Sequence, residues 1–124
     1  MSADSFQTLI NQKHATLVGM KEESDVRRHK NTTLPDDFIM FAGGDVNITE
    51  KILNGCNGLS SMVGNVYPKE IQKFFTDLVA KKPVNLQKIN KLIDKVTRGH
   101  AVVNIKNHYN ALGIKVGSCR SPIR

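Results

Sequence analysis

A lysine directly follows a short apolar segment near the start of the chain. Residues 15–20 (Ala-Thr-Leu-Val-Gly-Met) end at Lys21-Glu22-Glu23, and such a run predicts a buried strand. Ligands of parallel α/β sheets bind at the carboxyl ends of the strands. An amine removed from water there can attack a ketone and form an imine. By position alone, the commoner case is a surface lysine paired with Glu22 or Glu23.

A pair of glycines and an aspartate follow the next apolar run, residues 38–42. Gly43 and Gly44 allow a sharp turn with positive φ, and they let a small substrate lie against the main chain. Asp45 could bind substrate hydroxyls, or it could cap the following helix. For a lone aspartate, the cap is the commoner role.

Several other chemistries lack their motifs. His100 and His108 are eight residues apart, which is not a usual ligand spacing on one helix. No carboxylate stands in register with them, so we expect no metal site. Ser60 and Ser61 lack the Gly-x-Ser-x-Gly elbow of serine hydrolases. Neither glycine-rich phosphate-binding motif occurs, and we expect no cofactor.

The elements that must position these residues alternate between apolar runs and amphipathic segments. Ser24 is a candidate N-cap, and Asn47-Ile-Thr-Glu50 resembles a capping box. Pro68 opens a helix with an apolar face made of Ile71, Phe74, Phe75, Leu78 and Val79. Gly99 could interrupt the last helical region, and Gly113 could end it. We expect strands near 15–20, 38–42 and 59–63, and helices near 24–31, 47–54, 68–82 and 86–111.

This order predicts an α/β fold, in which helices cover a parallel sheet. We expect one incomplete (β/α)-barrel domain over residues 1–124, because a whole barrel takes about 250 residues. A sheet of three strands leaves two open edges, which are a liability in solution. Something else is therefore expected to cover those edges.

Composition indicates an ordinary globular protein. The net charge is +7, and nine Lys or Arg stand against three acids between residues 69 and 106. The charge favours a solvated lysine face over specific nucleic-acid binding, since no RNA-binding motif accompanies it. No run reaches the length of a membrane span, and the first 13 residues are polar. Cys56 and Cys119 are expected to be free thiols in the cytoplasm.

Three segments resemble, in order, one family of enzymes. Gly19-Met-Lys-Glu-Glu-Ser24 is similar to a Gly-x-Lys-Glu-x-Ser segment that carries an imine-forming lysine. Residues 41–45 (Phe-Ala-Gly-Gly-Asp) resemble the end of a seventh barrel strand. Residues 55–68 resemble the eighth strand and its loop, Gly-x-x-Gly-x-x-Ser-x-x-x-Asn-x-x-Pro. The family is the dihydrodipicolinate synthase/N-acetylneuraminate lyase group of class I aldolases, and the resemblance runs from about residue 15 to residue 123.

The resemblance implies strands 6–8 of a (β/α)₈ barrel with their helices and the C-terminal helices. It favours the catalytic interpretation of Lys21, which would form an imine with pyruvate or another 2-keto acid before reaction with an aldehyde. It implies a homo-oligomer or a complementary half-barrel chain as partner. It also implies substrate-binding residues at the three strand ends and a structural loop asparagine: Gly43, Gly44, Asp45, Ser60, Ser61 and Met62 for substrate, and Asn65 for the loop.

The departures from the family pattern are large. Family members carry five earlier strands, with a Gly-x-x-Gly-Glu segment for the keto-acid carboxylate and a proton-shuttling tyrosine. Neither Tyr67 nor Tyr109 stands at that tyrosine position. We therefore expect a truncated chain, active as a lyase only when the missing strands are supplied. The alternative is a catalytically inactive paralogue or fragment that acts in assembly or interaction.

Overall fold

Three short strands form a fully parallel sheet in the first half of the chain. In the computed structural model, which describes residues 2–23 and 32–123, they are β1 (Gly19–Glu22), β2 (Ile39–Gly43) and β3 (Gly58–Ser60), in the order β1-β2-β3. The predicted parallel sheet is confirmed. The chain divides into two units, Met1–Ser60 and Ser61–Arg124, which are described separately. That residues 1–124 act as one domain stays a prediction.

The first strand begins later than the sequence suggests. Leu17 donates its N–H to the His14 carbonyl at 3.0 Å, so the chain is still turning at residues 14–17. The strand begins at Gly19, and Lys21 therefore lies within β1 instead of following it. The third strand likewise ends at Ser60, three residues before its predicted limit.

The two faces of the sheet differ in burial. Met40 and Ala42 of β2 are fully buried on one face. Helix α3 (Ile48–Leu53) contacts β2, and its Ile48 and Ile52 are buried. On the other face Phe41 is 39% exposed, between Lys21 of β1 and Gly58 of β3 in the same row. Parallel sheets are normally covered on both faces, whereas the described residues of the first unit leave this face open.

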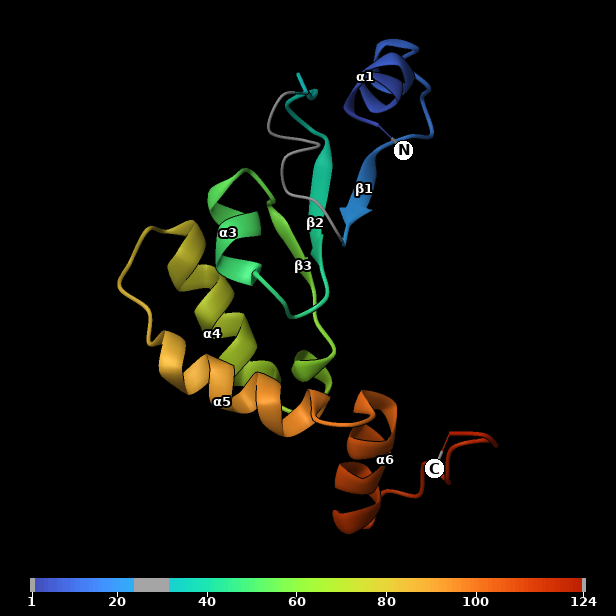
Figure 1. Ribbon diagram of the computed structural model, residues 1–124. Coiled ribbons are helices and arrows are strands. Elements are labelled where there is room, and N and C mark those ends of the chain that lie inside the picture. The colour runs from blue at the N-terminus through green and yellow to red at the C-terminus, as the bar shows by residue number, and fades with distance from the viewer. Residues whose placement is uncertain (1, 24–31, 124) are drawn as a thin grey trace. The chain divides into compact units, whose positions relative to one another are not determined.

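Helix α1 (Ala3–Asn11) precedes the sheet and was not predicted. Figure 1 shows it beside the start of β1. The Ser2 hydroxyl caps it by accepting the Ser5 N–H. Phe6 is fully buried, with its ring centroid 6.1 Å from that of Phe38, which immediately precedes β2. A buried aromatic pair therefore joins α1 to the sheet.

The capping box predicted at the start of α3 is wrong. Asn47 does precede the helix, but its φ is 56° and its side chain makes no capping bond. A left-handed residue does not aim its side chain at the N–H groups of the first turn as an extended N-cap residue does. The helix predicted at 24–31, with Ser24 as its cap, lies outside the described residues.

The second unit is helical. A 3₁₀ turn, η1 (Val63–Asn65), leads to α4 (Pro68–Val79), α5 (Leu86–Thr97) and α6 (Ala101–Ala111), and Figure 1 shows α4 and α5 side by side. Pro68 opens α4 as predicted. The helix stops before residue 82, and Val79 is exposed. The long helix predicted over 86–111 is two helices, separated where Gly99 has a φ of 75°.

The buried face of α4 largely matches the predicted one. Ile71, Phe74 and Leu78 are buried in α4, as Ile89 and Val96 are in α5. Basic side chains of this unit have partners within it. Lys73 pairs with Asp77 at 2.7 Å, and Lys106 donates to two carbonyls of the C-terminal segment. Every helix in the described part of the chain is too short or too polar to cross a bilayer.

Candidate functional site

Lys21 projects from the middle of β1 onto the open face of the sheet. Its side chain is 49% exposed, and Nζ lies 3.5 Å from Oε2 of Glu23, itself 68% exposed. An ion pair this exposed contributes little to stability. The expectation that the strand shields this amine from water is not met within the first unit, because Lys21 shares its open face with Ile39 and Phe41, which are also exposed.

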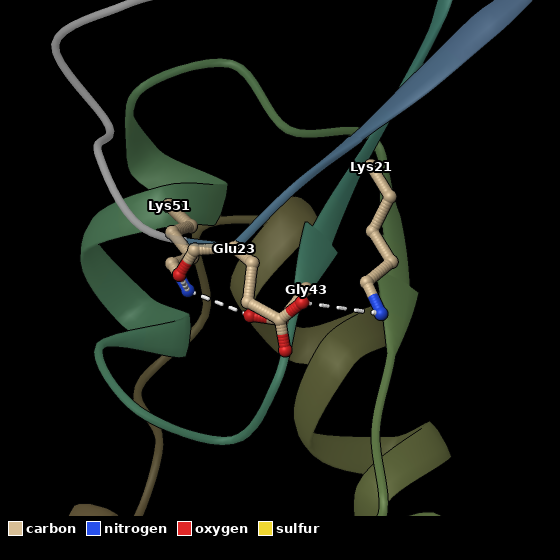
Figure 2. A network of polar contacts seen from close by, with 4 residues as sticks. All are labelled: Lys21, Glu23, Gly43 and Lys51. Atoms are coloured by element: carbon tan, nitrogen blue, oxygen red, sulfur yellow. Dashed lines mark hydrogen bonds and ion pairs between the residues drawn. The ribbon is translucent and has the colours of Figure 1, made fainter.

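Gly43, at the end of β2, makes room for the Lys21 side chain. A Cβ added to Gly43 would lie 2.9 Å from Cε and 3.0 Å from Cγ of Lys21, closer than side chains normally approach. The lysine stem therefore packs against this glycine, and Figure 2 shows the two residues next to each other. Lys21 pairs in register with Phe41, so Gly43 is the next residue of β2 on the same face. The sequence singled out both residues, and the structure brings them into contact.

A second lysine, Lys51 of α3, lies beneath this arrangement. It is only 4% exposed, and Nζ donates to the Gly43 carbonyl at 2.6 Å and to the Glu23 carbonyl at 2.9 Å. The sequence analysis missed it. The signal was present, because Lys51 stands three residues after Ile48 and directly before Ile52, within the apolar stripe of a short helix.

Gly44 and Ser60 connect the carboxyl ends of β2 and β3. Gly44 has a φ of 70°, which side chains other than glycine rarely adopt, and its N–H donates to the Ser60 carbonyl at 3.1 Å. Asp45, which follows, is 6% exposed. Lys21, Gly43, Gly44 and Ser60 therefore gather at one edge of the sheet, where parallel α/β proteins bind ligands. Substrate binding by Gly43, Gly44, Asp45 and Ser60 stays a prediction.

The remaining candidates, Ser61, Met62 and Asn65, belong to the second unit. The Ser61 hydroxyl accepts the Gly64 N–H at 2.9 Å, and the Asn65 side-chain amide donates to the Met62 carbonyl at 3.1 Å. Both bonds hold the turn around η1. The Asn65 bond supports the structural role predicted for this residue. Ser61 and Met62 stay predictions as substrate-binding residues.

Cys56 is buried on the helix-covered side of the sheet, at 3% exposure. Burial raises the pKa of its thiol above the ordinary value, the Lys51 ammonium lowers that pKa, and the Glu22 carboxylate raises it. Glu22 is 1% exposed. A buried charged cluster therefore lies between β1 and α3. Among the described residues, no group of three His, Cys, Asp or Glu side chains could hold a metal ion.

The raised thiol pKa gives a testable pH dependence. The native state keeps the Cys56 proton to higher pH than the unfolded chain, so the stabilising contribution is complete below the unfolded thiol pKa. It is lost as the pH rises through the folded pKa. We expect the free energy of unfolding to fall as the pH rises above the ordinary thiol pKa of about 8.5, and to fall less steeply in Cys56→Ala. Pulsed iodoacetamide labelling should modify the partly exposed Cys119 before Cys56; equal rates would contradict this.

Comparisons with known proteins agree with the geometry. The model of the Dihydrodipicolinate synthetase family matches residues 1–124. A 4-hydroxy-tetrahydrodipicolinate synthase of Exiguobacterium sibiricum is 30% identical over 118 residues, covering 90% of this chain and 40% of that protein. The enzyme of the same name from Dehalococcoides mccartyi is 29% identical over 86% of this chain and 38% of its own length.

A solved structure shows the same fold. The crystal structure of a dihydrodipicolinate synthase from Bacillus anthracis superposes with a TM-score of 0.76 at 22% identity, over 99% of this chain and 44% of that one. The fold is accordingly part of a (β/α)₈ barrel, as the sequence predicted. The chain spans about two fifths of the length of the curated relatives it matches. With a family model that matches from end to end, this chain belongs to the dihydrodipicolinate synthetase family.

Proposed function

We propose that the chain supplies the imine-forming part of a class I aldolase or lyase that acts on pyruvate or another 2-keto acid. Lys21 is the nucleophile. The observation that carries the proposal is the Lys21 stem, which runs over Gly43 at the ligand-binding edge of a parallel sheet. Relatives that match most of this chain bear the name 4-hydroxy-tetrahydrodipicolinate synthase, which supports the same reaction class here.

The chemistry follows from the amine. Neutral Nζ of Lys21 attacks the C2 carbonyl carbon of the keto acid, and the resulting carbinolamine loses water to give an imine. Protonation of the imine nitrogen makes it an electron sink, so a proton on C3 becomes acidic. Its loss leaves an enamine, whose C3 forms a bond to an aldehyde carbon. Water then releases the product from Lys21, and cleavage is the reverse sequence.

The proposed activity needs further strands to cover the open face of the sheet. In the first unit the Lys21 side chain is 49% exposed to water and its ammonium is ion-paired with Glu23. Further barrel strands laid over the face of Ile39 and Phe41 would remove water from Lys21. They would come from another part of a longer chain, from a partner chain or from a second copy. Gly43, Gly44, Asp45, Ser60, Ser61 and Met62 would then line the keto-acid and aldehyde sites.

Reductive trapping tests the proposal. The chain is incubated with pyruvate and cyanoborohydride and then digested, and the reduced adduct is quantified on each lysine. We expect Lys21 to carry at least about ten times more adduct than the exposed lysines Lys73 and Lys88 of the same sample, since orientation raises effective reactivity. Lys21→Arg should lose only that adduct. Uniform labelling of all exposed lysines would show that the chain alone does not make Lys21 a preferred nucleophile.

One observation favours a second candidate, an inactive paralogue that acts in assembly. Ile39 and Phe41 are 42% and 39% exposed on a sheet whose outer strands β1 and β3 each pair with β2 alone among residues 2–23 and 32–123. Such surfaces mark interaction sites. Sedimentation velocity over a concentration series separates the two functions. A tight dimer with no Lys21 adduct would favour assembly, whereas an adduct at Lys21 in any oligomeric state favours the enzyme.

A further inference from the structure

Lys51 is an unusual residue to find buried in a small unit. Lysine is almost never fully buried unless it is paired, and withdrawing an ammonium from water costs several kcal/mol in the absence of compensating bonds. Here Nζ donates two hydrogen bonds to backbone carbonyls, those of Gly43 and Glu23. A position that demands such compensation is expected to have a role beyond packing.

Both carbonyl partners flank the Lys21 side chain. Gly43 is the surface over which the Lys21 stem runs, and Glu23 supplies the carboxylate beside its Nζ. Lys51 therefore ties the end of β2 to the residue after β1, as Figure 2 shows. These two segments have no direct strand pairing at this point, because the β1–β2 register ends at Glu22 and Ala42. The Lys51 amine therefore joins β1 and β2 one residue beyond their last paired residues.

Lys51 does this from the covered side of the sheet. Its ammonium and the Glu22 carboxylate both act on the buried Cys56 thiol, so the three groups cluster near α3. Successive side chains of a strand point to opposite faces, and Glu22 therefore points away from the face that carries Lys21. A keto acid on the open face would meet Lys21 and not the 4%-exposed Lys51.

We propose that Lys51 is a positioning residue for the imine-forming lysine. It fixes the Gly43 and Glu23 backbones through its two hydrogen bonds, and it thereby fixes the path of the Lys21 stem. The expected effect on imine formation rests on the proposed function. The effect of Lys51 on the path of the Lys21 side chain does not depend on it. Lys51 makes no contact with substrate, and its effect is on the orientation of Nζ of Lys21.

The test compares three variants of the full chain. Lys51→Met keeps the length of the side chain and removes the donors, Lys51→Arg keeps donors and charge, and Lys91→Met is the control on exposed α5. We expect Lys51→Met to lower the rate of pyruvate trapping at Lys21 on the order of tenfold, because small misplacements of a reacting group are costly. Lys51→Arg should recover most of the rate, and Lys91→Met should keep it. Trapping at Lys73 in the same samples should not change.

A second measurement separates this inference from the proposed function. Reductive methylation with ¹³C-formaldehyde places an NMR probe on Lys21, assigned by its loss in Lys21→Arg. We expect its resonance to move in Lys51→Met and to return toward its original position in Lys51→Arg. If the native chain forms no pyruvate adduct at Lys21, the proposed function fails for the chain alone, and the resonance alone decides whether Lys51 positions this side chain.

Two outcomes would overturn the positioning role. One is an unchanged trapping rate together with an unmoved Lys21 resonance in folded Lys51→Met. The other is an equal loss of trapping in Lys51→Met and Lys51→Arg while both keep native hydrogen exchange at β2, which would show that the donors are not what matters. If Lys51→Met does not fold, Lys51→Leu, which also lacks the donors, takes its place and is read by the same criteria.

Discussion

Gly43→Val is expected to reduce pyruvate trapping at Lys21 by about 10²-fold while the sheet stays folded. A Cβ at this position would lie 2.9 Å from Cε of Lys21 and 3.1 Å from the Glu22 carbonyl oxygen. The lysine stem is flexible and can swing away, whereas the Glu22 carbonyl is backbone and has to shift slightly. The amine, however, leaves the edge where the keto acid would bind, and displacement of about 1 Å can cost that much in rate. Mass spectrometry of the trapped adduct measures the loss.

Comparison with Gly43→Ala and with a control variant shows whether the loss of trapping comes from crowding at residue 43. Gly43 does not have a positive φ, so a side chain here meets crowding without backbone strain, and Gly43→Ala should fall between native chain and valine. Ile39→Ala is the control, because Ile39 is on the same strand and face but pairs with Gly19, two residues before Lys21. Trapping by Gly43→Val within twofold of the native rate would show that the path of the stem over this glycine has no part in the chemistry.

The sequence identified candidate residues at the strand ends but not the contacts between them. Lys21 and Gly43 were both identified as strand-end residues, because a parallel sheet gathers the carboxyl ends of its strands at one edge. Their contact could not be predicted, since it depends on a register that pairs Lys21 with Phe41. The burial of Lys51 was also out of reach, because charge predicts exposure unless the partners are known. Those partners are backbone carbonyls. Because every residue has one, the sequence does not show which carbonyls Lys51 reaches.

The errors in the fold have related causes. Residues 15–18 resemble a strand by composition, yet a turn bond between Leu17 and His14 delays β1. Helix α1 was missed because its segment is mostly polar. Its apolar residues Phe6, Leu9 and Ile10 nevertheless have helical spacing, and two of them are buried. Local pattern located the three strands and the helices α3 and α4 in order, whereas tertiary contacts decide where each element begins and which polar side chain is buried.

Phe6→Ala is expected to cost about 3–5 kcal/mol, much of the stability of a unit of this size. Phe6 is fully buried, and its ring packs against Phe38 at a centroid distance of 6.1 Å. Removing the ring leaves a cavity and loosens α1, whose only other buried residue is Ile10. The hydrogen bonds between the Gln7 side chain and the Thr33 backbone are exposed, so they compensate little.

The measurement must report on the first unit alone, since α4, α5 and α6 dominate any helical signal. Hydrogen exchange at the Met40 and Ala42 amides of β2 does so, because both residues are fully buried in the sheet. Exchange there should accelerate by at least about 10²-fold in Phe6→Ala and stay unchanged in Thr8→Ala, an exposed site on the same helix. Unchanged exchange in Phe6→Ala would mean that α1 is not part of the cooperative unit that holds Lys21.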